Sequence, residues 1–294
     1  MFVLLPEVEI LDLAGPLQAL GEANRSHGRY RIRLASTKER VRSDQGVVLA
    51  DLEPLPAVDE NTLVIVPGMP YRATQKIERA VVRWLRDASG SGAHLASVCT
   101  GAFVLGEAGL LEGRRCTTHW SRTGELAQRF PNARVLTDRL FVTDGSVTTS
   151  AGIASGIDMA LALIEQTDGP LVAAAVAREM VVYLRRDGAQ EQQSVYLDFR
   201  THLHPGVHRV QDWIVRNPDR RPTLDELADV AGMSSRNLTR TFRKATGISV
   251  HEFSTRVRLE LARSLAHEPS LTMDAVARRS GLSARELRRL GVRR

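Results

Sequence analysis

The chain has little cysteine, few aromatic residues and no long hydrophobic run. Its 294 residues include two cysteines, Cys99 and Cys116, and aromatic residues make up 5% of the total. Two cysteines without a CxxC pair supply neither a disulfide framework nor a cysteine zinc site, so we expect a reducing, cytoplasmic compartment. No stretch approaches the roughly 18 uninterrupted apolar residues of a membrane span. Pro6, Glu7 and Glu9 interrupt the apolar start, and we expect no secretory signal.

Positive charge is concentrated in the last third of the chain. Residues 201–294 contain 18 Lys and Arg against 10 Asp and Glu, whereas residues 1–200 contain 22 against 24. Localised basic charge is the electrostatic signature of a polyanionic partner, although a solvated arginine-rich surface gives the same count. Charge alone leaves both interpretations open, and the motifs must decide between them.

Strand-like and helix-like segments alternate in the first half of the chain. Short β-branched runs predict strands at residues 2–5, 30–35, 62–66, 93–98, 134–136, 140–143 and 147–149. Apolar residues at helical spacing predict helices at residues 17–24, 75–88 and 102–108 and from Ile157 onward. This alternation predicts an α/β fold with a mainly parallel sheet covered by helices on both faces.

Strand signals end near residue 170, and the rest of the chain is expected to be helical. We predict an α/β domain over residues 1–185, a connector over residues 186–204 and an all-α domain over residues 205–294. The last region contains a weak internal repeat, because LDELADVAGMSSRNLTR resembles MDAVARRSGLSARELRR. A repeat of this length indicates two copies of one helical motif.

The first copy has the pattern of a helix-turn-helix motif. Thr223 can cap a helix, with Glu226 completing a capping box, and Gly232 permits the tight turn that follows. In the next helix Leu238 and Phe242 are four residues apart and are expected to pack inward. Its outer faces then carry Arg236, Asn237, Thr239, Arg240 and Arg243. These donors suit base edges and phosphates of double-stranded DNA, whereas a plain amphipathic helix pair is the alternative.

Residues 205–288 resemble the DNA-binding region of AraC-type regulators, in which one long helix joins two helix-turn-helix motifs. The matching residues are Ser234, Leu238, Arg240, Phe242, Gly247, Arg258, Ala262, Leu265, Ala277 and Gly281. The resemblance implies that Arg236, Thr239 and Arg240 read bases.

The second motif departs from the family pattern. Its turn, GLSA at residues 281–284, is one residue short in this comparison, and Gly291 stands where a buried Phe is expected. We interpret the domain as truncated at its end. Arg285, Arg288 and Arg289 are therefore expected to bind phosphates and to add affinity with little specificity.

In the α/β domain, the sequence ASVCTGAF places a thiol between a strand and a helix. Cys99 ends the predicted strand and Gly101 opens the helix, which is a nucleophile-elbow arrangement. The helix N-terminus would lower the pKa of such a thiol, so we predict a low pKa for Cys99 and an ordinary one for Cys116. A small core cysteine is the alternative for Cys99. We interpret Cys116 as a strand-core residue.

Residues 2–185 resemble the class I glutamine amidotransferase-like superfamily, on the branch that contains isocyanide hydratase. The resemblance is carried by LDLAGP, VIVPGMP, SVCTGAFVLGEAGLL, TTHW and TSAGIASGIDMAL. It implies a flavodoxin-like parallel sheet sandwiched by helices. It also makes Cys99 the elbow thiol, Thr100 its neighbour, Asp12 the facing carboxylate and Gly68 a backbone amide donor. These four residues are the candidate ligand-binding set, and Cys99, Asp12 and Thr100 are the candidate catalytic residues.

Histidines are available but do not form an obvious site. Thr100 occupies the position beside the thiol where peptidase-like branches have His, and we interpret His119 as structural. His202, His204 and His208 have no recognised zinc spacing, so we expect no metal, and no cofactor is implied.

The order of the two regions and the segment HLHPGVHRVQDW resemble GlxA-type regulators. This resemblance implies a non-enzymatic, homodimeric transcription regulator that binds DNA and a small-molecule effector near Cys99 and does not bind membranes. Two alternatives remain open at this point. In one, the Cys99 thiolate attacks an electrophilic carbon while Asp12 shuttles a proton and Gly68 stabilises charge. In the other, oxidation of Cys99 makes it a redox sensor.

Overall fold

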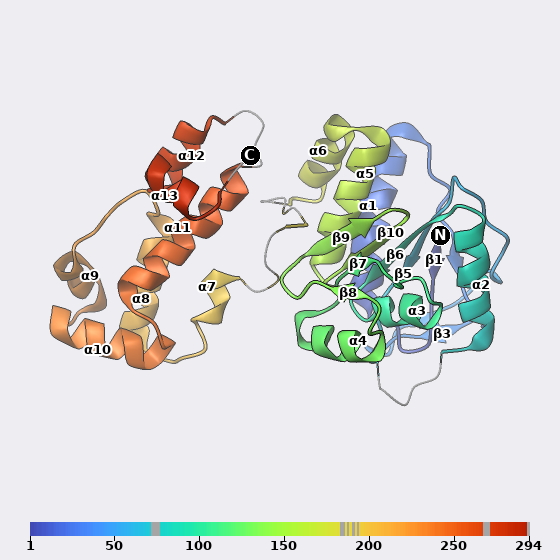
Figure 1. Cartoon of the computed structure of the whole chain (residues 1–294), viewed down its shortest axis with the longest axis horizontal. Coiled ribbons are helices and arrows are strands. Elements are labelled where there is room, and N and C mark those ends of the chain that lie inside the picture. Colours follow the sequence, from blue (N-terminus) through green and yellow to red (C-terminus); the bar gives the residue numbers. More distant parts are fainter. Residues whose placement is uncertain are drawn as a thin grey trace. The chain divides into compact units, whose positions relative to one another are not determined.

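The computed structural model describes residues 1–71, 77–182, 186, 188–189, 192, 194–266 and 271–292 (Figure 1). The chain forms two compact units, unit 1 over Met1–Gln192 and unit 2 over Gln193–Arg294. Each unit has its own hydrophobic core. No helix in the described part of the chain is long and apolar enough to cross a membrane.

Unit 1 is built on a six-stranded sheet, which confirms the predicted α/β fold. The strand order is β2-β1-β5-β6-β10-β9, and every neighbouring pair is parallel except β10 with β9. The strands are β1 (Phe2–Val3), β2 (Leu34–Ala35), β5 (Leu63–Val66), β6 (His94–Val98), β9 (Phe141–Asp144) and β10 (Val147–Ser150). Two small two-stranded sheets flank it, β3 (Val41–Arg42) with β4 (Val48–Leu49), and β7 (Arg115–Cys116) with β8 (Arg134–Val135).

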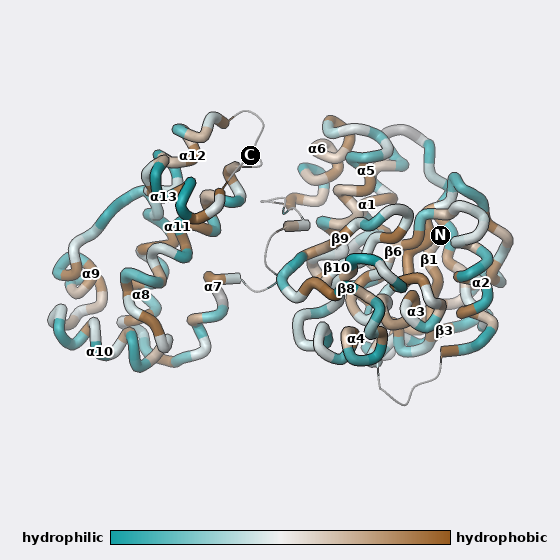
Figure 2. Tube along the Cα trace, in the orientation of Figure 1, coloured by the Kyte–Doolittle hydropathy of each residue, from teal (hydrophilic) through white to brown (hydrophobic). Residues whose placement is uncertain are grey.

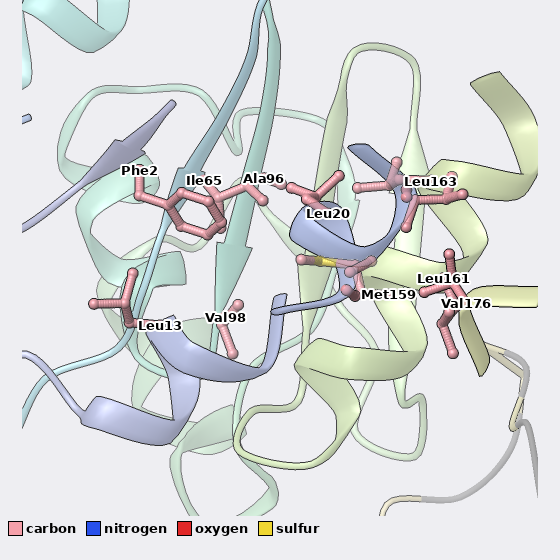
Figure 3. Packing of buried hydrophobic residues seen from close by; sticks show 14 of the residues in the cluster. Phe2, Leu13, Leu20, Ile65, Ala96, Val98, Met159, Leu161, Leu163 and Val176 are labelled. Carbon is pink, nitrogen blue, oxygen red and sulfur yellow. The ribbon is translucent and has the colours of Figure 1, made fainter. Parts of the chain in front are cut away.

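Helices cover both faces of the sheet because its strands are apolar on both sides. Side chains alternate along each strand, so Phe2 packs into one core cluster while the adjacent Val3 packs into the other. The first cluster, shown in Figure 3, lies against α1 (Ile10–His27), α5 (Ser155–Asp168) and α6 (Pro170–Glu179). The second lies against α2 (Arg79–Gly90) and α3 (Gly101–Glu107). Figure 2 shows hydrophobic residues along β1, the second strand in the order of the six-stranded sheet.

The first helix is longer than predicted. The sequence places its start at Leu17, after a proline, whereas α1 begins at Ile10 and contains Pro16. The expectation was wrong because proline usually occupies the first helical turn, and here it lies inside the helix. The longer helix puts Asp12 in its first turn, beside the end of the sheet. The predicted start of α2 at Gln75 lies outside the described residues.

Unit 2 consists of helices arranged around two smaller cores, in agreement with the predicted all-α region. Its helices are α7 (Val195–Asp198), α8 (Pro205–Arg216), α9 (Leu224–Ala231), α10 (Ser235–Thr246), α11 (Val250–Ala266), α12 (Met273–Ser280) and α13 (Ala284–Arg289). One core joins α8, α9 and α10 to the first half of α11. The other joins the second half of α11 to α12 and α13. The long helix α11 therefore connects two helix pairs.

Candidate functional site

The first helix pair in unit 2 has the geometry of a helix-turn-helix motif. Helix α9 begins with the predicted capping box between Thr223 and Glu226, and it ends at Gly232 with φ +68°. Helix α10 then buries Leu238 and Phe242 completely. The arginines and the threonine predicted to face outward, Arg236, Thr239, Arg240 and Arg243, are exposed.

Asn237 has a different place from its four companions. It is half-buried, and its Oδ1 accepts hydrogen bonds from Arg240 Nη2 at 3.1 Å and from Thr241 Oγ1 at 3.2 Å. The side chain thus orients Arg240 on the helix surface. The amide oxygen of Asn237 already accepts these two hydrogen bonds.

The second helix pair repeats the first residue for residue through its turn, which corrects the expectation of a short turn. Helix α12 ends at Gly281, with φ +68°, and Ser283 caps α13. In the first motif Gly232 and Ser234 have the same separation. Leu287, buried like Leu238, follows its turn glycine by the same six residues. The turn is the same length in both motifs.

The end of the second motif is also anchored. Gly291 does stand ten residues after its turn glycine, where the first motif has Phe242. The chain turns there with φ +74°, and the next residue, Val292, is 5% exposed and packs into the same core as Leu287. A smaller side chain one position later therefore takes the place of the missing aromatic.

Two arginines that were given no role in the sequence hold the motifs together. Arg258 on α11 is 8% exposed, and its guanidinium donates to the carbonyl oxygens of Pro218 at 2.9 Å and Arg220 at 2.7 Å. Arg221 donates to Gly281 O at 3.1 Å and to Glu286 at 3.0 Å. The loop before α9 is thus tied to both α11 and the second turn. The pair of arginines before Pro222 is the only local signal for this contact.

In unit 1, Cys99 lies between β6 and α3 in a strained backbone conformation. Its φ is +55°, a region that non-glycine residues rarely adopt, and its N–H donates to Ser150 O at 3.0 Å. Thr118 Oγ1 donates to the Cys99 carbonyl oxygen at 2.7 Å. These contacts with β10 and with the loop after β7 hold the backbone in the strained turn.

The structure brings the four candidate ligand-binding residues together. A Cβ on Gly68 would lie 2.2 Å from Asp12 Oδ2, 2.9 Å from Cys99 Cβ and 3.0 Å from Thr100 Oγ1. Only glycine fits there, because a side chain would collide with all three neighbours. The backbone of Gly68 therefore lies next to the Asp12 carboxylate, Cys99 and the Thr100 hydroxyl.

Asp12 is completely buried and only half satisfied. Its Oδ1 accepts a hydrogen bond from Ile153 N at 2.7 Å. Its Oδ2 faces Cys99 and Gly68 and forms no hydrogen bond of normal geometry with the residues described. Burial raises the pKa of Asp12 to about 6, although the Ile153 amide acts in the opposite direction.

Both thiols have raised pKa values, which corrects the prediction of a reactive Cys99. Burial, and then the charge of Asp12, raise the pKa of Cys99 to about 12, while the Thr100 N–H lowers it by less. Burial, with a contribution from Asp144, raises the pKa of Cys116 to about 11. Desolvation therefore outweighs the helix N-terminus at Cys99.

Thr100 and His119 have positioning contacts. The Thr100 hydroxyl accepts from Met69 N at 2.8 Å and donates to Met69 O at 2.5 Å, so it fixes the loop after β5. His119 Nδ1 lies 2.8 Å from Ser121 Oγ at the start of a short helical turn, as a structural role requires. His202 and His208 stack with ring centroids 4.3 Å apart in unit 2.

Sequence reasoning assigned no role to the loop after β10. Gly152 has φ +110°, and a Cβ there would lie 2.8 Å from Cys99 Sγ. Ile153 has φ +49°, donates to Asp12, and is 46% exposed. Its place in the segment TSAGIASG was a signal, but only the fold shows that this loop closes over the thiol.

One hollow of unit 1 lies away from this site. It measures about 700 Å³ and is lined by residues that include Phe2, Leu63 and His94. Because His94 begins β6 and Cys99 follows its end, the hollow and the thiol lie at opposite ends of that strand. Cys99 itself is 9% exposed, so its surroundings form a tight, nearly closed site.

Comparison with known proteins agrees with both units. Residues 1–166 match the DJ-1/PfpI family, and residues 227–290 match a helix-turn-helix domain. The HTH-type transcriptional regulator CdhR of Pseudomonas aeruginosa is 32% identical over 96% of this chain and 84% of its own length. The regulator GlxA of Rhizobium meliloti is 29% identical over 96% and 88%.

Two further relatives match a smaller share of the chain. The isonitrile hydratase of Pseudomonas putida is 34% identical over 57% of this chain and 71% of its own length. The crystal structure of an AraC family transcriptional regulator from Pseudomonas putida has a TM-score of 0.55 and 25% identity, and covers 61% of this chain and 97% of its own. Together with the paired helix-turn-helix motifs, these matches show that the chain belongs to the DJ-1/PfpI family, among its AraC-type helix-turn-helix transcriptional regulators.

Proposed function

We propose that this regulator binds its operator under the control of a small metabolite that binds beside Cys99. The observation that carries the proposal is Asp12. A fully buried carboxylate with one oxygen lacking a normal hydrogen bond is costly, and such groups persist where a ligand completes them. A ligand that donates a hydrogen bond or carries positive charge would satisfy this oxygen.

The thiol supports binding in preference to turnover. A nucleophile acts as the thiolate, and the raised pKa of Cys99 keeps it protonated at neutral pH. The same protonation makes it a poor target for peroxide. A neutral thiol next to Asp12 instead supplies a polar wall for a bound molecule.

On the DNA side, we assign base contacts to Arg236, Thr239 and Arg240, and a phosphate contact to Arg243. All four side chains are exposed on α10, whose inner face is fixed by Leu238 and Phe242. A homodimer would present these helices to two half-sites. The metabolite would then change operator affinity by favouring one arrangement of the dimer.

The test is a thermal-shift screen of metabolites against the full chain, repeated with Asp12→Asn. A true effector raises the melting temperature of the wild type and of an exposed-acid control, Asp87→Asn, but not of Asp12→Asn. At about 100 times its dissociation constant it should add about 2.7 kcal/mol of stability. It should also change operator affinity in a gel shift. Hits that stabilise Asp12→Asn equally would refute the site.

The pH dependence of stability gives a second check on Asp12. Its pKa is raised from 3.8 to about 6 in the folded protein, so folding favours the protonated acid. The stability it contributes is complete below about pH 3.8 and is lost as the pH rises to about 6. Asp12→Asn should remove this loss and leave the protein at least as stable as the wild type at pH 7. Lower stability of the variant at that pH would contradict the assignment.

An enzymatic role is the second candidate, and one observation favours it. Cys99 and Asp12 are both present and adjacent in a chain related to an isonitrile hydratase. Incubation with an isocyanide, followed by loss of the substrate, tests this directly. Turnover that disappears in Cys99→Ser would establish the enzyme, and no turnover leaves the binding role.

A further inference from the structure

A segment leads out of unit 1 and is called the exit segment here; its described residues are 186, 188, 189, 192 and 194–200. One of their side chains connects it to the Cys99 site. Gln192, the last residue of unit 1, places its Nε2 2.9 Å from Thr118 O, 3.0 Å from Arg139 O and 3.1 Å from Thr117 Oγ1. Two of these acceptors are carbonyl oxygens, which only accept hydrogen bonds, so the amide nitrogen must face them. Thr117 and Thr118 are both completely buried.

Thr118 continues this connection to the thiol residue. Its carbonyl oxygen receives Gln192, and its hydroxyl donates to Cys99 O at 2.7 Å. The Cys99 backbone has the positive φ that needs support from its surroundings. One residue therefore separates the strained elbow from the exit segment.

The two polar atoms of the Gln192 side chain differ in their hydrogen bonding. Its Nε2 has three acceptors within 3.1 Å. Its Oε1 is buried and has no hydrogen-bond partner among the described residues. A buried acceptor without a donor regains a partner when it reaches water, so release of the side chain is partly compensated. This balance is what a contact with two accessible states requires.

Other described residues of the exit segment dock on the same unit. The Arg186 guanidinium donates to Asp158 Oδ2 on α5 through Nε at 3.0 Å and Nη2 at 2.6 Å, and Ala189 O accepts from Arg139 Nη1 at 2.9 Å. A Cβ on Gly188 would lie 2.5 Å from Phe141 O. These contacts hold the described residues of the segment on unit 1, and among those residues Gln192 alone reaches the backbone next to Cys99.

We propose that Gln192 is a positioning residue that couples the state of the Cys99 site to the docking of the exit segment, and through it to the DNA-binding unit. This inference rests on the proposed function. The thiol is closely packed on the side of Gly152, because a Cβ there would lie 2.8 Å from Cys99 Sγ. A group that binds beside Cys99 therefore pushes on the strained elbow. Displacement of the elbow moves Thr118 through its hydroxyl, which bonds to Cys99 O, and so releases Gln192.

Alkylation of Cys99 tests the coupling without any metabolite. The full chain is treated with N-ethylmaleimide, modification of Cys99 is confirmed by mass spectrometry, and limited tryptic cleavage within residues 186–200 is timed. Coupling energies between sites typically correspond to about 5–150-fold changes. We expect cleavage at least about fivefold faster after modification. An unchanged cleavage rate in the modified wild type would overturn the proposal.

Two variants locate the connection. Gln192→Glu places a carboxylate against two carbonyl oxygens, so it should release the segment without modification and speed alkylation of Cys99 at least about fivefold. Gln128→Glu makes the same change on the exposed face of α4 (Thr123–Arg129) and should match the wild type. Gln192→Glu that behaves like this control would also refute the coupling.

Thr118→Val keeps the carbonyl that Gln192 binds and removes the hydroxyl that reaches Cys99. In this variant alkylation should no longer alter cleavage, whereas a response equal to that of the wild type would exclude Thr118 as the connection. It also serves if Gln192→Glu fails to fold. A metabolite screen without hits would remove the proposed function and leave these results standing.

Discussion

The two helix-turn-helix motifs share their backbone but differ in how firmly they are packed. Both have a glycine turn at φ +68° and a serine cap at the same spacing. The first motif is anchored by Phe242 in a large core, and the second by Val292 in a small one. Shared local geometry therefore does not imply equal stability, because stability follows buried area.

We expect the largest difference between the two motifs in the stability lost when each anchoring side chain, Phe242 or Val292, is truncated. Phe242→Ala removes a completely buried ring and should cost about 3–5 kcal/mol, whereas Val292→Ala should cost about 1–2 kcal/mol. Hydrogen exchange resolved by mass spectrometry would locate the loss in α10 for the first variant and in α13 for the second. Equal losses would show that the two motifs are packed alike.

We expect the second-largest difference in the stability lost when each turn glycine, Gly232 or Gly281, is replaced by alanine. A Cβ on Gly281 would lie 2.4 Å from Pro218 O, whereas one on Gly232 would meet only the flexible end of Arg209, at 3.5 Å. Gly232→Ala should cost about 1–2 kcal/mol for the left-handed backbone alone. Gly281→Ala should cost more, because the backbone of the preceding loop must move. Chemical denaturation measures both, and a smaller cost at Gly281 would contradict the close contact.

Base reading should be more similar than packing. In register, Arg285 and Arg289 of α13 correspond to Arg236 and Arg240 of α10. The expectation that the second motif lacks specificity depended on a short turn and a missing anchor. The turn has the same length in both motifs, and Val292 takes the place of the missing aromatic. Each arginine changed to alanine should weaken binding by about 1–3 kcal/mol.

Selection of bound sites from random DNA with each of these variants would show which base positions lose preference. We expect α10 variants to affect one major groove and α13 variants another, about one helical turn away. One difference should appear in α13. Its counterpart of Asn237 is Glu286, which is bonded to Arg221 and cannot orient Arg289 in the same way. Loss of affinity without loss of preference in the α13 variants would restore the original expectation.

We expect the smallest difference in the stability of the second motif at low pH. The cap at Ser283, followed by Arg221, lowers the pKa of Glu286 from 4.5 to about 2. A depressed pKa contributes stability that is complete above about pH 4.5 and is lost as the pH falls toward 2. The protection factors of the α13 amides, which correct for the intrinsic pH dependence of exchange, should fall over this range in the wild type. In Glu286→Gln these protection factors should not change with pH.

Local patterns in the sequence were sufficient for much of this molecule. Alternating apolar strands and helices predicted the layered sheet, and the Thr223 capping box and Gly232 predicted the first turn. The segment around Cys99 predicted an elbow between a strand and a helix. These features depend on residues a few positions apart, so their physical causes are visible in the sequence.

What depended on distant residues was decided only by the tertiary structure. The pKa of Cys99 was predicted to fall, because the helix N-terminus is local. It rises because the burial supplied by other segments, and then the charge of Asp12, outweigh that contribution. The anchoring of α13 by Val292 follows from three-dimensional packing. The contact of Gln192 with Thr118 spans 74 positions. Desolvation and long-range hydrogen bonds are properties of the folded environment, and no local motif encodes them.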